Sequence, residues 1–201
     1  MLHQVSAVLL AAGLARRMGQ LKQLLPLGSL TAIEHCINSV LSGGVLDVVV
    51  VIGPEGAEVS SAIGHLPVTI AENSDSSSDM AASVRVGLNS LKDRLSSVLV
   101  FPVDHPLVLS DTIKALLAGH QNNPKAIIIP SHNRRRGHPT LFPREIIQQI
   151  FESSSLRDVV RRHETLIDFL EVEDCGVVLD MDTPEQYALV QQEYTNRKEY
   201  E

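Results

Sequence analysis

A glycine-containing segment near the N-terminus carries the residue types that bind phosphate groups. Residues 10–26 read LAAGLARRMGQLKQLLP. Small residues let a ligand approach the backbone, and successive backbone N–H groups in such a turn can form an anion-binding concavity. Arg17 and Lys22 add the positive charge that phosphoryl transfer requires. The segment therefore predicts a phosphate site, although an ordinary strand-to-helix loop with a solvated Arg and Lys explains the same residues about equally well.

The spacing of the segment excludes two common nucleotide-binding motifs. It contains neither G-x-G-x-x-G nor G-x-x-x-x-G-K-[ST]. The dinucleotide fingerprint and the P-loop are therefore both absent from these residues.

Three aspartates follow apolar runs and form a candidate metal site. Asp104 comes directly after residues 97–103, and Asp180 and Asp182 come after residues 176–179. Carboxylates suit Mg²⁺, which proteins often hold through one or two of them together with substrate phosphates. Each aspartate also stands close to a proline, so capping of a turn or of a helix is the competing interpretation.

Alternating strand and helix patterns predict the elements that must bring these residues together. Short apolar runs rich in Val and Ile predict strands at residues 5–10, 45–52, 68–71, 97–103 and 126–129. Apolar residues with helical spacing predict helices at residues 31–41, 55–63, 80–91 and 112–120. This alternation predicts an α/β fold with a parallel sheet covered by helices on both faces. Ligands bind at the carboxyl ends of such strands, so the glycine segment and Asp104 should face one edge.

The second half of the chain has a less regular pattern. Residues 131–139 are polar and basic and predict an exposed loop, whereas residues 145–152 and 156–162 predict helices. Residues 167–172 and 176–179 predict strands, and Pro184 predicts the first turn of a closing helix. No linker long enough to divide the chain is present, so we expect a single domain over residues 1–201.

Composition narrows the functional class. The 201 residues carry a formal net charge of −7, which argues against a general nucleic-acid binder. Cys36 and Cys175 lie far apart without a CxxC pair, so neither a disulfide framework nor a structural zinc site is expected. No signal peptide and no apolar stretch of membrane-spanning length are visible. We therefore expect a cytoplasmic protein without nucleic-acid or membrane partners.

The glycine segment resembles a known signature. It is similar to L-A-A-G-x-S-x-R-M-G-x-x-K-x-L-L-P, which marks the molybdenum cofactor cytidylyltransferase group of nucleotidyltransferases. The resemblance implies a three-layer α/β/α Rossmann-like nucleotidyltransferase fold with a mostly parallel sheet. It implies phosphate contacts for Lys22 and nucleotide contacts for a set of loop residues: Leu10, Ala11, Ala12, Gly13, Arg17 and Gly19. Ala15 departs from the signature, because a serine is usual there.

The same resemblance implies roles for the aspartates. Asp104 stands where the family's D-x-P supplies a metal ligand, and residues 180–185 resemble its D-x-D-T-P-E element. Asp180 or Asp182 would then also approach the metal, a choice that the sequence leaves open. Catalysis would rest on Arg17, Lys22 and Asp104 with Mg²⁺ as cofactor.

Two further segments carry the resemblance. Residues 134–142 read RRRGHPTLF and are similar to the family's G-H-P-x-L-F, which implies acceptor contacts for Gly137, His138 and Pro139. The arginines before them could bind an anionic acceptor or form a solvated basic loop. Residues 73–88 resemble a segment that lines the nucleotide pocket, which implies a nucleotide contact for Ser83. Asp79 departs from the usual glycine and is alternatively the N-cap of the following helix.

The resemblance finally implies a reaction. CMP would pass from CTP to the phosphate of a molybdopterin-type acceptor, with a molybdenum hydroxylase apoenzyme as a possible recipient. Ala12 favours CTP, because guanylyl-transferring relatives usually read L-A-G-G there. Residues 1–110 would mainly bind nucleotide and residues 111–201 mainly acceptor. The alternatives are a guanylyl or sugar-phosphate transferase of the same superfamily, or a weakly catalytic protein that binds and delivers the cofactor.

Overall fold

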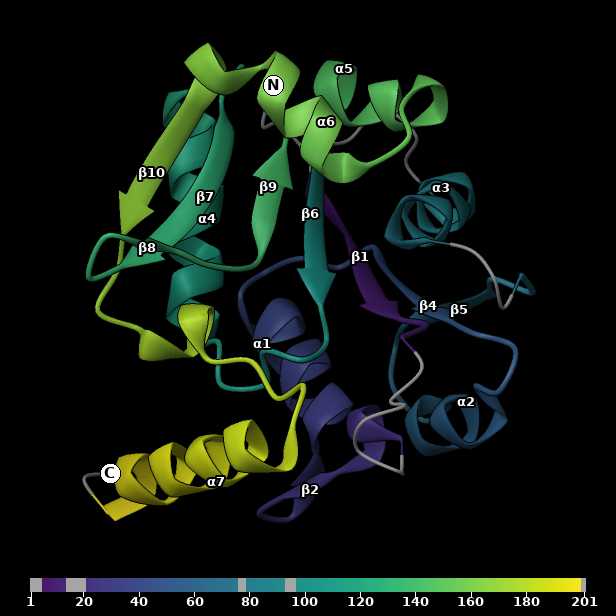
Figure 1. The fold of residues 1–201 in the computed structure, drawn as a ribbon, viewed down its shortest axis with the longest axis vertical. Helices are drawn as coiled ribbons and strands as arrows, with labels where there is room; N and C mark the ends of the chain where they lie inside the picture. Colours follow the sequence, from purple (N-terminus) through teal and green to yellow (C-terminus); the bar gives the residue numbers. More distant parts are fainter. Residues whose placement is uncertain (1–4, 14–20, 76–78, 93–96, 200–201) are drawn as a thin grey trace.

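A mostly parallel β-sheet forms the centre of the protein (Figure 1). The computed structural model describes residues 5–13, 21–75, 79–92 and 97–199. In this part of the chain, eight strands make one sheet in the order β10-β7-β9-β6-β1-β4-β5, with β8 paired to β7. The strands are β1 (Val5–Ala11), β4 (Val48–Ile52), β5 (Thr69–Glu72), β6 (Ser97–Pro102), β7 (Ile127–His132), β8 (Arg135–Arg136), β9 (Thr140–Phe142) and β10 (Ile167–Glu171). β9 runs antiparallel to β6 and β7, and β8 antiparallel to β7, whereas the other neighbours pair in parallel.

Helices cover both faces of this sheet. One face carries α1 (Ala32–Ser42), α2 (Ala57–Ile63) and α4 (Ser110–Asn122). The other carries α3 (Met80–Ser90), α5 (Arg144–Ile147), the 3₁₀ segment η2 (Gln148–Glu152) and α6 (Leu156–Arg162). Successive residues of β1 serve the two faces in turn, since Ala7 and Leu9 join the first core and Val8 joins the second. The predicted three-layer α/β/α architecture is confirmed.

The C-terminal helix packs away from the sheet. α7 (Pro184–Glu199) begins at the predicted proline and lies beside a small hairpin of β2 (Pro26–Leu27) and β3 (Leu30–Thr31) (Figure 1). Val190 of α7 joins Leu27 and Leu107 in a third apolar cluster. No helix in the described ranges is long and apolar enough to cross a membrane.

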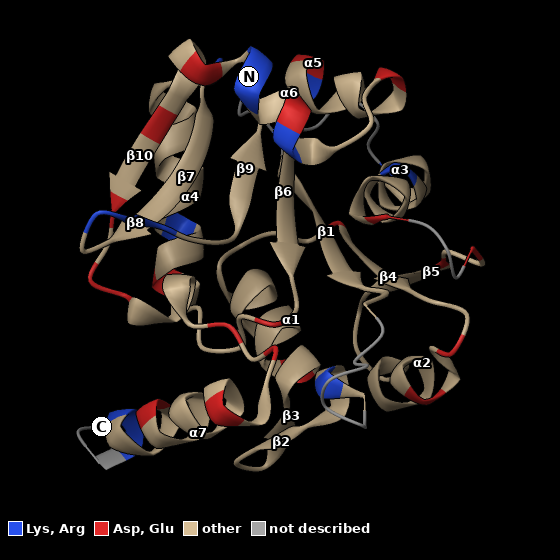
Figure 2. Ribbon diagram, viewed as in Figure 1, with Lys and Arg blue, Asp and Glu red and all other residues tan. Residues whose placement is uncertain are grey.

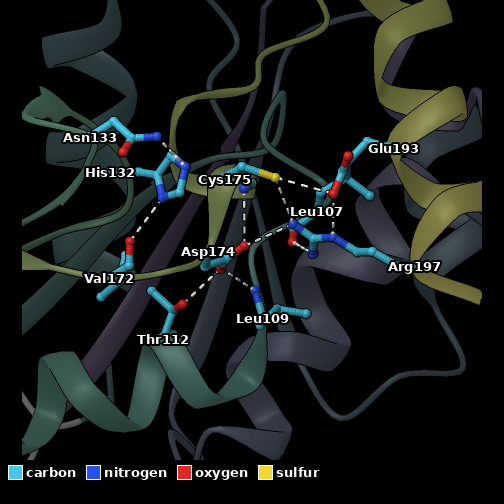
Figure 3. Close-up of polar contacts among 11 residues, drawn as sticks. Leu107, Leu109, Thr112, His132, Asn133, Val172, Asp174, Cys175, Glu193 and Arg197 are labelled. Carbon is cyan, nitrogen blue, oxygen red and sulfur yellow. Dashed lines mark hydrogen bonds and ion pairs between the residues drawn. The ribbon is translucent and has the colours of Figure 1, made fainter. Parts of the chain in front are cut away.

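A polar network fixes the end of this helix (Figure 3). The Arg197 guanidinium donates to Asp174 Oδ1 at 3.0 Å and to the Leu107 carbonyl at 2.7 Å. Asp174 Oδ2 also accepts from the Leu109 N–H at 2.8 Å and from the Thr112 hydroxyl at 2.7 Å. α7 is thereby attached to the segment that leads from β6 into α4.

Residues 176–179 are not the predicted strand. They lie mostly in a 3₁₀ turn, η4 (Cys175–Val178), whose Gly176 N–H donates to Asp174 Oδ1 at 3.0 Å. A Cβ on Gly176 would stand 2.3 Å from the Leu107 carbonyl oxygen. The capped turn and this close packing bury Val177 without a sheet ladder, so the apolar run misled the prediction.

Residues 131–139 are likewise not a simple exposed loop. The stretch contains the end of β7, all of β8 and a tight turn at Asn133 and Arg134, where φ is 51° and 63°. Ser131, Gly137 and Pro139 are buried, and only the turn and the arginines of β8 face solvent. A hairpin that requires positive φ explains the polar composition.

Candidate active site

Two neighbouring parallel strands bring the glycine segment and Asp104 to the same edge of the sheet. β1 pairs with β6 in a register that places Leu10 opposite Pro102. Because these strands run in the same direction, residues 12–13 and Asp104 leave the sheet side by side. The prediction that they share one edge is confirmed.

Lys22 links two carboxylates at this edge. It begins the short 3₁₀ turn η1 (Lys22–Leu24), and its Nζ lies 2.9 Å from Asp104 Oδ2 and 2.6 Å from Asp182 Oδ1. The side chains of Lys22 and Asp104 are 13% and 20% exposed, whereas that of Asp182 is 46% exposed. Burial alone would lower the pKa of Lys22, but the two carboxylates outweigh it and raise the pKa above its ordinary value. Lys22 is therefore a fixed positive charge between two negative ones.

Asp104 keeps one oxygen without a hydrogen bond. Burial works to raise the pKa of Asp104, but the Lys22 ammonium and the nearby His105 imidazole hold the pKa below its ordinary value. Its Oδ1 is buried and makes no hydrogen bond in the described part of the chain, and His105 Nε2 lies 3.6 Å away. Asp104 therefore binds Lys22 through one carboxylate oxygen and keeps the other buried beside His105.

The glycine segment and the carboxylates line one cavity of about 440 Å³. Its described lining comes from the ends of β1, β4, β5 and β6, from η1, from the start of α3 and from the turn before α7. The residues are Leu10, Ala12, Gly13, Lys22, Gln23, Gly53, Pro54, Asn73, Asp75, Asp79, Met80, Ser83, Pro102, Asp104 and Asp182. The cavity is large enough for a small-molecule ligand.

The α3 end of the cavity contains the predicted Ser83. Its hydroxyl accepts from Asn73 Nδ2 at 3.0 Å, and both side chains are buried. Asp79 caps α3, since its Oδ1 accepts from the Ala82 N–H at 2.9 Å. The N-cap interpretation of Asp79 is confirmed, although its carboxylate also borders the cavity.

The predicted acceptor residues do not line this cavity, although His138 lies near Asp104. The imidazole of His138 packs against that of His105, with ring centroids 4.9 Å apart and planes tilted by 50°. Burial, reinforced by the neighbouring His105, lowers the pKa of His138 to about 4. The imidazole of His138 is therefore neutral. Its backbone N–H donates to the Val177 carbonyl oxygen at 2.9 Å.

Gly137 is required at its position by close packing. A Cβ there would stand 2.4 Å from the Val177 carbonyl oxygen. Of the arginines that precede it, Arg134 lies in the turn after β7 and the other two lie on β8, which pairs with the end of β7 apart from β1 and α3 (Figure 2). Arg136 places its guanidinium 4.8 Å from the centre of the Phe169 ring. The structure thus separates these arginines from the cavity.

The two C-terminal aspartates have different surroundings. Asp182 is paired with Lys22, whereas Asp180 Oδ1 accepts a hydrogen bond from Gln186 Nε2 and does not line the cavity. The described residues contain no group of three or more His, Cys, Asp or Glu side chains that could hold a metal. A metal at Asp104 and Asp182 would take its remaining ligands from substrate and water.

Only some of the predicted loop residues that the structure describes line the cavity. Leu10, Ala12 and Gly13 line the cavity, whereas Ala11 packs its methyl group in the core and offers its carbonyl to Gln23. Arg17 and Gly19 fall outside the described residues.

Gln23 is a site residue that sequence reasoning missed. Its side chain is 2% exposed, and its Nε2 donates to the carbonyls of Ala11 at 2.7 Å and Gly13 at 3.0 Å. The available signal was a single uncharged polar residue among the leucines of LKQLL.

Comparison with known proteins places the chain in a family. The model of the MobA-like NTP transferase domain matches residues 7–167. The chain belongs to this family. It is therefore an enzyme, a nucleotidyltransferase of the NTP-transferase superfamily, and the predicted family resemblance is confirmed.

Individual relatives of this transferase carry different names. It is 30% identical over 194 residues to the nicotine blue oxidoreductase of Paenarthrobacter nicotinovorans, covering 90% of this chain and 94% of the relative. It is 24% identical over 194 residues to the molybdenum cofactor cytidylyltransferase of Escherichia coli (strain K12), covering 95% and 97%. A Mycobacterium tuberculosis H37Rv protein solved in complex with manganese has the same fold, with a TM-score of 0.78, 22% identity and coverage of 94% and 98%.

Proposed function

We propose that this transferase moves CMP from CTP to the phosphate of a molybdopterin-type acceptor and releases pyrophosphate. One observation carries the proposal: the Lys22 ammonium stands between Asp104 and Asp182 in the cavity that the glycine segment lines. Oriented backbone groups, a cation and two carboxylates are the parts that transfer of a nucleotidyl group needs.

The reaction needs little proton transfer. An acceptor phosphate oxygen attacks the α-phosphorus of CTP, a new P–O bond forms, and the bond between the α-phosphorus and the bridging oxygen breaks. Pyrophosphate leaves with that electron pair. Because a phosphate is already ionised at neutral pH, the chain needs no general base. Its residues act by orienting the two substrates and by neutralising charge, with Lys22 and Arg17 as the cations.

The carboxylates fit a divalent metal. Asp104 and Asp182 each place one carboxylate oxygen at the Lys22 ammonium, and the second oxygen of Asp104 makes no hydrogen bond in the described residues. Oxygen donors of this kind suit Mg²⁺. When bound, Mg²⁺ would neutralise phosphate charge. Asp104 and Asp182 would hold it, and the manganese complex of the mycobacterial neighbour supports a divalent ion at this fold. Asp180 would support the pair through the turn before α7.

Residues around Asp104 support the choice of nucleotide and of acceptor. Ala12 in the cavity and the name of the Escherichia coli relative support CTP, with Ser83 as a nucleotide contact. Gly137, His138 and Pro139 would bind the acceptor. The neutral ring of His138 packs against His105, whose Nε2 lies 3.6 Å from Asp104 Oδ1, and this places His138 near the candidate metal ligand. We place the reaction in the cytoplasm, which the free thiols of Cys36 and Cys175 support, and infer a molybdenum hydroxylase apoenzyme as recipient.

Pyrophosphate release tests the proposal. Purified protein is incubated with Mg²⁺, a molybdopterin-type acceptor and each of CTP, GTP, UTP and ATP in turn. CTP should release pyrophosphate fastest, and EDTA should abolish the release. Activity with GTP alone would assign a guanylyltransferase instead. The nicotine blue oxidoreductase relative makes a redox enzyme the rival to exclude, and such an enzyme would consume an electron donor without releasing pyrophosphate from any NTP.

A further inference from the structure

Gln23 and Lys22 are consecutive residues of one 3₁₀ turn, and their side chains bind different parts of the site. Lys22 reaches the carboxylates of Asp104 and Asp182. Gln23 donates through Nε2 to the carbonyl oxygens of Ala11 and Gly13. The turn η1 therefore connects residues 11–13 to the candidate metal ligands through two adjacent side chains.

The Gln23 hydrogen bonds fix the direction in which the carbonyl groups of Ala11 and Gly13 point. A peptide unit is planar and trans, so a carbonyl that points towards Gln23 sends the following N–H in the opposite direction. Phosphate binding by backbone requires N–H groups, whereas a carbonyl oxygen repels phosphate. By holding two carbonyls, the Gln23 amide prevents them from turning towards a phosphate.

The backbone at Gly13 is a place where such a restraint has an effect. Gly13 is exposed, and among the described residues a Cβ built on it would meet only the Lys22 Cε, at 4.0 Å. Glycine in open space adopts several backbone conformations at little cost. The signature that this stretch resembles has a serine where this sequence has Ala15. The Gln23 amide restrains this backbone through the carbonyls of Ala11 and Gly13.

Packing alone does not explain the amide. Gln23 is 2% exposed, and its Oε1 makes no hydrogen bond in the part of the chain that the structure describes. A buried polar atom without a partner is unfavourable, and an apolar side chain of similar size would avoid it. The amide is therefore kept for the two bonds that its nitrogen donates.

We propose that Gln23 is a positioning residue that locks the backbone of residues 11–13 in the conformation that accepts NTP phosphates. This inference rests on the proposed function only in requiring that an NTP occupy the cavity. It does not depend on the base or on the acceptor. Gln23 touches neither phosphate nor metal in this proposal and acts through the backbone of residues 11–13.

The test compares binding of CTP with binding of cytidine by NMR titration, with GTP and guanosine in parallel. Gln23→Met keeps the size of the side chain but cannot donate. Its dissociation constant for CTP should rise about tenfold, which corresponds to about 1.4 kcal/mol, while that for cytidine stays within twofold. Gln23→Glu, whose carboxylate repels both carbonyls, should lose at least as much affinity for CTP.

Gln149→Met is the matched control. Gln149 lies in η2 on the other face of the sheet, where its side chain contacts His163, so the same exchange should leave CTP binding unchanged. Equal CTP binding by Gln23→Met and wild type would overturn the positioning role, as would a parallel loss of cytidine affinity. If wild type binds neither CTP nor GTP, the proposed function fails and this inference fails with it. If wild type binds CTP and only the acceptor assay fails, the role of Gln23 still stands or falls on the binding data.

Discussion

Replacement of Lys22 by methionine provides a quantitative test of the charge arrangement. The variant leaves Asp104, 20% exposed, next to Asp182 without a cation between them. Removing one partner of a buried ion pair costs about 3–5 kcal/mol, and the contribution of a half-exposed pair such as Lys22–Asp182 is about 0–1 kcal/mol. Because the site opens into a cavity, we reduce the first figure and expect a loss of about 2–3 kcal/mol. At about 2–4 °C per kcal/mol for a chain of this size, the melting temperature should fall by roughly 5–10 °C.

A double-mutant cycle isolates the interaction. Asp104→Asn removes the charge that Lys22→Met leaves unpaired, so the double variant should be more stable than Lys22→Met alone and lie within about 2–4 °C of wild type. Thermal unfolding of the four proteins, followed by circular dichroism at pH 7, gives the coupling free energy. If the melting temperature of the double variant is lowered by the sum of the two single-variant decreases, Lys22 and Asp104 do not compensate each other and our account is wrong.

The pH dependence adds an independent check. The pKa of Asp104 is lowered in the folded wild type, so its ionisation stabilises the fold above the unfolded pKa of about 3.9 and this contribution is lost as pH falls through the lower folded pKa. In Lys22→Met the main cause of lowering is gone and burial raises the pKa of Asp104. Acid should then favour the folded variant, and the difference in melting temperature from wild type should shrink between pH 7 and pH 4. A constant difference would contradict the assignment.

Three further predictions concern the site and its surroundings. Asp104→Asn should lower pyrophosphate release by roughly 10²–10³-fold with little change in far-UV circular dichroism, because it removes charge at the reacting end of β6; unchanged turnover would refute the metal role. Gly137→Ala should destabilise the fold by about 1–3 kcal/mol in thermal unfolding, since its Cβ would strike the Val177 carbonyl. Gly119→Ala, near the end of α4, should be neutral or stabilising, because its Cβ would make only an ordinary contact with Ile128 at 3.7 Å. His138 should titrate by NMR with a midpoint near 4; because its folded pKa is depressed, stability is full above about pH 6.5 and falls as pH drops towards 4, and a midpoint near 6.5 would show that the ring is not buried as described.

The sequence indicated the outline of the fold where local pattern and tertiary environment agree. The continuous apolar runs of β1 and β4 are buried on both faces, as parallel strands require, and α6 spans the predicted residues 156–162 behind its Ser155 cap. The shared edge of residue 13 and Asp104 followed from strand direction alone. These features depend on the spacing of apolar residues and on strand direction, which the local sequence pattern indicates well.

Other features depend on contacts between distant residues and could not be predicted from local pattern. Residues 176–179 look like a strand, but packing of Gly176 against Leu107 and capping by Asp174 make them a turn. The three-residue β9 is too short for an alternating pattern to identify it. Gln23 has no charge or motif to mark it, and its role depends on hydrogen bonds to residues ten and twelve positions away.

The attachment of α7 has a consequence for how long the carboxylate pair stays assembled. Asp182 lies directly before this helix, and Arg197 ties the far end to Asp174 and Leu107. Both residues come after the region that the family model matches, residues 7–167. A local opening that detached the C-terminal helix would withdraw one carboxylate and leave the sheet folded. We therefore expect the free energy of such an opening, and not global stability, to set the fraction of molecules in which the site is complete.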